Sequence, residues 1–200
     1  MAGSASVTLR TLVGGLSFNS VVTKEDELEV VFTRALPSGK AGTLSTRTDA
    51  DTGILTVLTG HGITASDTVS VFWSGGYRYG VDVTATTATT ISIDIGSGAD
   101  LPAVTTAIVV GKEETHTLAI TGNQLSLFVI DCDLRSSVNF RDVSNVSLLA
   151  YDLLANEGRM WTAGAGVTNP LAGDVATNVV LANGGITATD FRIGMLASTN

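Results

Sequence analysis

Side chains that could perform chemistry are few in this 200-residue chain, and the first group matches part of a calcium-binding loop. The segment TDADTG, residues 48–53, places Asp49 and Asp51 at the first and third positions of such a loop. Gly53 and Gly60 then occupy the fifth and twelfth positions, where a calcium loop needs oxygen ligands. A β-turn in which aspartate side chains accept hydrogen bonds from nearby amides explains the segment better. The sequence therefore predicts no metal ligand here.

The two histidines and the single cysteine are far apart in the sequence. His61 stands between two glycines at the end of an expected strand, and His116 alternates with threonines in another. Neither has the three or four neighbouring ligands of a zinc site, so we expect both to pack or hydrogen-bond locally. Cys132 stands between Asp131 and Asp133, whose charges disfavour its thiolate, and we expect it to fill a position in an apolar strand. The sequence predicts no metal, cofactor or intrachain disulfide.

Motifs of catalytic sites are missing from the sequence. No G-x-S-x-G nucleophile elbow occurs. The segment PSGKAG, residues 37–42, is expected to be a turn. Near it, Arg34 replaces the first glycine of a phosphate-binding loop and Ala41 replaces its Ser or Thr. The acidic run 25–29 is typical of a solvated face or turn. Two carboxylates that meet only in the folded chain could still hydrolyse a glycoside, but we predict that the protein is not an enzyme and has no catalytic residue.

Three aromatic residues could bind a glycan or a protein partner: Trp73, Tyr77 and Tyr79. Alternation places both tyrosines on one face of a strand, together with Val81 and Val83, and Trp73 could join them across a turn. Aromatic rings also stabilise antiparallel sheets by packing directly. We therefore favour packing in a core or a subunit contact over glycan binding.

The elements that carry these residues are predicted to be strands. Residues 68–73 and 77–84 alternate between apolar and polar types around the turn Ser74-Gly75-Gly76, a pattern typical of a β-hairpin. Further short β-branched runs cover residues 54–59, 91–95 and 105–110. These five strands, separated by turns rich in Gly, Asp and Ser, predict a small antiparallel barrel or sandwich over residues 43–112.

The residues on either side predict a second, sandwich-like β domain. The barrel-like unit is either inserted into this domain or followed by it. Strands are expected at 28–36, in 115–134 and in 177–196. We expect an all-β protein with an N-terminal arm and the first strands of one domain in 1–42, the five-stranded unit in 43–112, and the remainder of the first domain in 113–200. The segment 146–155 fits both a helix face and a strand, and its neighbours favour a strand.

Charge and hydropathy exclude several classes of partner. The formal net charge is −8, and no basic stripe is present to neutralise phosphate, so direct binding of nucleic acid or of an anionic membrane is not expected. No run of about 18 apolar residues predicts a membrane span. The N-terminus lacks the basic and apolar regions of a secretory signal, and we expect the chain to fold in the cytoplasm.

Two segments resemble proteins of a known kind. Residues 42–83, GTLSTRTDADTGILTVLTGHGITASDTVSVFWSGGYRYGVDV, together with the GADLPA turn at 98–103 and NEGRMWTAGAGVTNPLAGD at 156–174, resemble β modules of tailed-phage virion proteins and of related uncharacterised prophage or planctomycete proteins. The resemblance covers about half of the chain and carries no catalytic motif.

The resemblance implies a structural role in a virion, as a capsid-decoration or tail-associated protein assembled in the host cytoplasm. Its implied partners are further copies of itself and the major capsid protein or other virion proteins. We expect the arm 1–20 or the loop 164–174 to make these contacts. A carbohydrate-binding or adhesive β module, using Trp73, Tyr77 and Tyr79, is the alternative.

Overall fold

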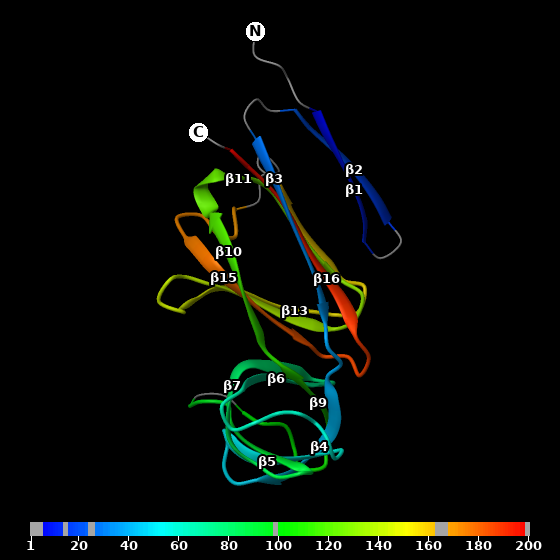
Figure 1. Ribbon diagram of the computed structural model, residues 1–200, viewed down its shortest axis with the longest axis vertical. Coiled ribbons are helices and arrows are strands. Elements are labelled where there is room, and N and C mark those ends of the chain that lie inside the picture. Colours follow the sequence, from blue (N-terminus) through cyan, green and yellow to red (C-terminus); the bar gives the residue numbers. More distant parts are fainter. Residues whose placement is uncertain (1–5, 14–15, 24–26, 98–99, 163–167, 199–200) are drawn as a thin grey trace.

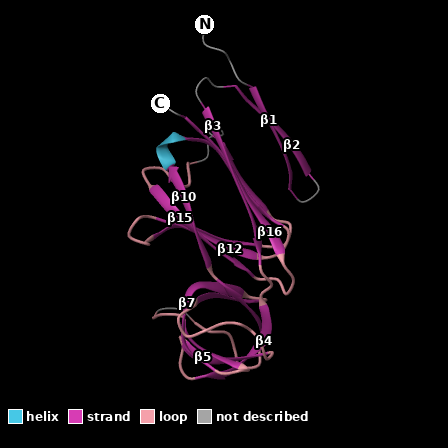
Figure 2. Cartoon of the chain, viewed as in Figure 1, coloured by secondary structure: helices cyan, strands magenta, loops and turns pink. Residues whose placement is uncertain are grey.

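The computed structural model describes residues 6–13, 16–23, 27–97, 100–162 and 168–198 (Figure 1). The prediction of an all-β protein is confirmed: the described residues form sixteen strands, and their one helical segment is the 3₁₀ turn Gly122–Gln124 (Figure 2). Every strand pairing is antiparallel. No helix among these residues has the length and apolar character needed to cross a bilayer.

The middle of the chain forms a closed barrel of six strands in the order β4-β5-β8-β7-β6-β9. The strands are β4 (Lys40–Arg47), β5 (Thr52–Val57), β6 (Thr68–Trp73), β7 (Gly76–Thr86), β8 (Thr90–Asp94) and β9 (Ala107–Lys112). The period-two pattern fills the interior, as in β8, where Ile91 and Ile93 are buried between half-buried polar neighbours. Closure leaves this sheet without the free edges on which strands of other chains could pair.

The barrel has one strand more than the sequence predicts. The additional strand, β4, begins at Lys40, inside the segment 37–42 that the sequence suggests is a turn. Gly42 is directly opposite Val57 of β5, and a Cβ at Gly42 would collide with the backbone oxygen of Thr56. The glycine therefore serves the close approach of two strands rather than a turn.

Two four-stranded sheets pack face to face beside the barrel (Figure 1). One sheet has the order β10-β15-β12-β13 and the other the order β14-β11-β16-β3. Their strands are β10 (Glu114–Thr121), β15 (Val175–Asn183), β12 (Ser136–Arg141) and β13 (Ser147–Leu153), and β14 (Gly158–Thr162), β11 (Leu125–Cys132), β16 (Thr189–Ser198) and β3 (Glu27–Leu36). The shared core includes an edge-to-face pair of Phe128 and Phe140, whose ring centroids are 5.4 Å apart.

The order of the strands places the barrel between two parts of the sandwich. β3 precedes the barrel in the chain, and β10 to β16 follow it. Figure 1 shows the barrel at one end of the sandwich, where β3 leads into β4 and β9 leads into β10. The segment 146–155 contains strand β13, so the interpretation of this segment as a strand is confirmed.

The first described residues form a separate hairpin of β1 (Ser6–Val13) and β2 (Leu16–Thr23). This hairpin is a two-stranded sheet of its own and hydrogen-bonds to no other described strand. The sequence predicts an arm over residues 1–20; positions 1–5 and 14–15 of that arm are outside the described residues.

Candidate functional site at the barrel–sandwich junction

Polar side chains converge where the barrel meets the sandwich, and Arg135 is the most connected of them. It lies just before β12, and its Nε and Nη2 donate to the Asp152 carboxylate of β13 at 2.9 and 2.6 Å. Its Nη1 donates to the backbone oxygen of Trp73 at 2.7 Å, and its Nη2 donates to that of Gly76 at 3.0 Å. The guanidinium also lies 5.3 Å from the centroid of the Phe72 ring. One side chain of the sandwich therefore holds the β6–β7 turn of the barrel.

Glu113 makes the second connection, from the short link between β9 and β10. Its side chain is 5% exposed, and its carboxylate accepts hydrogen bonds from Ser70 Oγ at 2.8 Å and from the Gly80 amide at 2.7 Å. Arg141 Nη2 of β12 lies 3.7 Å from the same carboxylate. Ser70 Oγ is also 2.9 Å from Ser137 Oγ of the sandwich. A buried charge is tolerated only when donors surround it, and here these donors come from both domains.

The turn after β15 completes the junction on another side. Asn183 Nδ2 donates to the backbone oxygen of Pro37 at 3.0 Å, next to the residues that enter the barrel. The Gly39 amide donates to the Gly185 backbone oxygen at 2.8 Å. A Cβ at Gly111, in β9, would collide with the backbone of Asn183. Backbone contact at both connections therefore limits movement of the barrel relative to the sandwich.

A β-bulge in β7 decides which way the predicted aromatic residues face. The register shifts between Val69 and Val71 of β6, and Gly80 has a φ of +65°, a conformation that favours glycine. The additional residue reverses the alternation, so Val81 is in the barrel interior while Tyr77, opposite Phe72, is on the outer face. The prediction that the tyrosines share a face with Val81 and Val83 is therefore wrong.

The structure brings Tyr77 and Tyr79 together and separates Trp73 from them. The two tyrosine rings have centroids 6.0 Å apart, and Tyr77 stacks on Phe72 at 6.3 Å. Trp73 instead packs against the barrel core, with the Arg78 guanidinium 6.0 Å from its ring. Burial, followed by the charge of Asp152, raises the pKa of Tyr77, as expected of a packed phenol.

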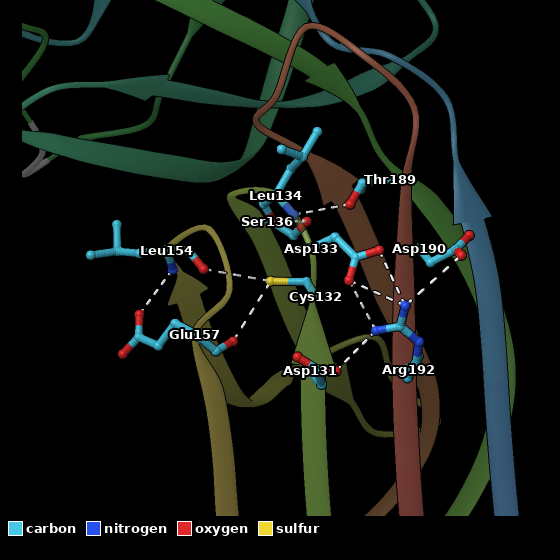
Figure 3. Close-up of polar contacts among 10 residues, drawn as sticks. All are labelled: Asp131, Cys132, Asp133, Leu134, Ser136, Leu154, Glu157, Thr189, Asp190 and Arg192. Atoms are coloured by element: carbon cyan, nitrogen blue, oxygen red, sulfur yellow. Dashed lines mark hydrogen bonds and ion pairs between the residues drawn. The ribbon is translucent and has the colours of Figure 1, made fainter. Parts of the chain in front are cut away.

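Cys132 is buried in β11 (Figure 3). Its Sγ donates to the backbone oxygens of Leu154 at 3.7 Å and Glu157 at 3.8 Å. Burial raises the pKa of the thiol to about 12, and the neighbouring charges of Asp131 and Asp133 act in the same direction. The expectation of a disfavoured thiolate is confirmed, and burial is the larger cause.

Arg192 of β16 pairs with the acidic residues beside Cys132 (Figure 3). Its guanidinium donates to Asp131 at 2.9 Å and to both carboxylate oxygens of Asp133 at about 3.1 Å, and lies 3.9 Å from Asp190. The hydrogen bond to Asp133 is the main cause that raises the pKa of Arg192. The carboxylates of Asp131 and Asp133 therefore share one cation of the same chain, the Arg192 guanidinium.

The other candidate ligands of the sequence also have local partners. His61 Nε2 lies 2.9 Å from the Thr87 backbone oxygen, and Nδ1 accepts from the Ile63 amide at 3.1 Å, which selects the neutral tautomer with hydrogen on Nε2. His116 lies 3.3 Å from Glu114. Within the described ranges, no group of three or more His, Cys, Asp or Glu side chains is arranged to hold a metal ion.

The TDADTG segment is a turn, as interpreted from the sequence. Asp49 Oδ1 accepts from the amides of Thr52 at 2.7 Å and Asp51 at 3.1 Å. The hydrogen bonds with Thr52 are the main cause that lowers the pKa of Asp49 to about 2.

Sequence patterns did not identify the residues of the junction, except that the charged run Lys112-Glu113-Glu114 suggests a domain boundary there. Arg135 and Ser137 lie 59 to 67 positions from the barrel residues to which they hydrogen-bond. No short motif could therefore connect them. Comparison with protein-family models, curated proteins and solved structures finds no match to this chain.

Proposed function

We propose that this chain is a non-enzymatic structural protein of a phage-like virion, a capsid-decoration or tail-associated component that acts in many copies. The resemblance of residues 42–83 and 156–174 to virion proteins supports the type of particle. Copies of itself and the major capsid protein or other virion proteins are its proposed partners, and assembly takes place in the host cytoplasm.

The observation that carries the proposal is that ionisable side chains hydrogen-bond across the fold and join its parts. Arg135 and Glu113 fasten the barrel to the sandwich, and His61 fastens a barrel loop to the β7–β8 turn. A rigid two-domain unit suits a lattice component, because a contact made by one domain restrains the other. Stabilisation then comes from added interface, on the order of 1,600 Å² for a standard contact, repeated over many copies.

The test is the composition of particles. Particles banded on a density gradient from cells that carry the gene should contain this chain in many copies, measured by quantitative mass spectrometry. Recovery of the chain only in the particle-free fraction would refute the proposal. Antibody labelling in electron microscopy then separates a capsid position from a tail position.

Glycan binding is the second candidate, favoured by the adjacent Tyr77 and Tyr79 rings on the outer face of β7. Tyr79 is 38% exposed and offers a ring for stacking on a sugar. Binding to a glycan array should fall at least tenfold for Tyr79→Ala and remain unchanged for Trp73→Phe, whose ring packs on the barrel core. The absence of any bound glycan for the unmodified protein would remove this candidate.

A further inference from the structure

The junction contains the one Asn-Gly dipeptide of the sequence, Asn183-Gly184, at the end of β15. Asparagine side chains lose their amide group slowly in water and are among the thermolabile groups of proteins. The loss is fastest before glycine, because a residue without Cβ leaves its own nitrogen free to attack the asparagine side chain. The asparagine with the most reactive sequence context therefore lies where the barrel meets the sandwich.

Deamidation of this dipeptide passes through a succinimide ring. The Gly184 nitrogen gives its proton to hydroxide and forms a bond to Asn183 Cγ. The bond between Cγ and Nδ2 breaks, and Nδ2 leaves as ammonia after taking a proton from water. Water then opens the ring at one of its two carbonyls, which gives aspartate or isoaspartate. The reaction consumes water, releases ammonia and needs no other reactant.

Both polar atoms of the Asn183 side chain are held in the folded chain. Nδ2 donates to the backbone oxygens of Pro37 at 3.0 Å and Thr187 at 2.7 Å, and Oδ1 accepts from the Gly185 amide at 2.7 Å. These partners also fix which atom is nitrogen and which is oxygen. The residue is 1% exposed. The carboxamide therefore cannot turn toward the Gly184 nitrogen without breaking these hydrogen bonds.

The attacking nitrogen is held as well. The Gly184 amide donates to the backbone oxygen of Arg135 at 2.7 Å, and Asn183 pairs with Ser136 of β12. In the extended backbone of a paired strand, the nitrogen of the next residue lies away from the side chain. Ring closure therefore requires this end of β15 to leave its partner strand.

The barrel covers the same dipeptide. A Cβ added at Gly184 would lie 2.9 Å from the Phe72 ring of β6, and a Cβ at Gly111 of β9 would collide with the backbone of Asn183. Pro37, which accepts from Nδ2, lies next to the residues that enter the barrel. Undocking of the barrel would release these contacts together. The rate of a reaction that needs an open state follows the population of that state when opening is fast.

The product does not fit the closed junction. A carboxylate in place of the amide sets an acceptor against two other acceptors, the backbone oxygens of Pro37 and Thr187. A buried charge that faces no donor is strongly destabilising. Isoaspartate also adds a carbon atom to the backbone, which breaks the register between β15 and Ser136.

We propose that Asn183-Gly184 is a modification site that the docked barrel keeps closed. When the junction opens, the asparagine deamidates, and the junction then cannot close again. The site is an irreversible switch from a rigid two-domain unit to one with a released barrel. The inference goes beyond the proposed virion role and does not depend on it, because every test below uses the purified chain and none uses particles.

The first experiment compares the folded full-length chain with the same chain unfolded in guanidinium. Both are incubated at mildly alkaline pH in water enriched in heavy oxygen, which labels each new carboxyl group, and the peptide that contains Asn183 is followed by mass spectrometry. We expect deamidation to be at least about 100-fold slower in the folded chain. A smaller difference would overturn the proposal.

The second experiment loosens the junction without changing the dipeptide. Arg135→Met removes the side chain that holds the β6–β7 turn but keeps the backbone oxygen that binds Gly184. Deamidation of the folded variant should be at least about 10-fold faster than that of the unmodified chain. Arg159→Ala, which loses an exposed ion pair of the sandwich, should leave the rate unchanged.

An equal rate in Arg135→Met and Arg159→Ala would show that the junction does not control the reaction, and would overturn the proposal. If Arg135→Met does not fold, Phe72→Leu takes its place, because it removes only the ring that lies against Gly184. The same increase is expected, and the same result would overturn the proposal.

The third experiment examines the product with Asn183→Asp. Urea unfolding is followed by the fluorescence of Trp73 and of Trp161, each in a background that lacks the other. We expect the two midpoints to separate, because the barrel is no longer held. Asn156→Asp adds the same charge at an exposed position and should leave the midpoints coincident. Coincident midpoints in Asn183→Asp would overturn the irreversible switch.

Discussion

Replacement of Arg135 by methionine should lower the free energy of unfolding more than any single surface substitution. Methionine keeps an unbranched aliphatic stem but has none of the guanidinium donors that bind Asp152, Trp73 and Gly76. The charge-assisted pair with Asp152 contributes about 1.5–3 kcal/mol, and each hydrogen bond lost at a backbone carbonyl costs about 0.5–1.5 kcal/mol. The side chains of Arg135 and Asp152 retain 20% and 18% exposure, so water offsets part of this loss. We expect the free energy of unfolding to fall by about 3 kcal/mol.

The two tryptophans allow the effect to be assigned to each domain, because Trp73 is in the barrel and Trp161 is in the sandwich. Urea unfolding would be followed by fluorescence in a Trp161→Phe background and in a Trp73→Phe background. With Arg135 present, the two transitions should coincide, because the junction couples the domains. In Arg135→Met, we expect the two midpoints to separate.

Two comparisons make this prediction refutable. Arg159→Ala removes an ion pair with Glu157 in which the arginine is 49% exposed, and it should cost at most about 1 kcal/mol. Adding Asp152→Asn to Arg135→Met should restore about 1 kcal/mol, because the amide carries no unpaired charge. If Arg135→Met costs no more than Arg159→Ala, or if its two transitions still coincide, Arg135 does not couple the domains.

Three further predictions concern the bulge, the turn and the thiol. Gly80→Ala should cost about 1–2 kcal/mol in urea unfolding because of its φ of +65°, whereas Gly75→Ala, with ordinary contacts, should change stability by less than about 0.5 kcal/mol. Asp49 has its pKa lowered from 3.8 to about 2, so its contribution to folding is complete above the unfolded-state pKa and is lost as the pH falls from about 4 to 2. Asp49→Asn should reduce the loss of stability in that window, measured as thermal midpoint against pH. Cys132 should resist a thiol reagent at pH 8 until the protein is unfolded, and rapid labelling of the folded protein would contradict its burial.

The strands of the barrel were largely predictable because alternation with a period of two is a local property. Ile91 and Ile93 both face inward because side chains two positions apart in a strand lie on the same face. Turn chemistry, which is also local, identified the turn at Asp49, whose hydrogen bonds join residues two and three positions apart. It failed at Gly42, where a glycine typical of turns instead allows two strands to approach closely.

The faces of the tyrosines show how tertiary structure changes a local pattern. Alternation placed Tyr77, Tyr79 and Val81 together, but the bulge at Gly80 moved both tyrosines to the outside. The bulge is supported by Glu113, whose carboxylate accepts the Gly80 amide from 33 positions away. No pattern within the strand contains this information.

The sequence by itself determined the class of the fold, the inward residues of most barrel strands and the local character of its turns, because these follow from contacts between near neighbours in the chain. The tertiary structure alone decided how the barrel is joined to the sandwich and which aromatic rings meet. Those outcomes depend on contacts such as the one between Ser70 and Ser137, 67 positions apart. Such distant residues meet only in the folded chain.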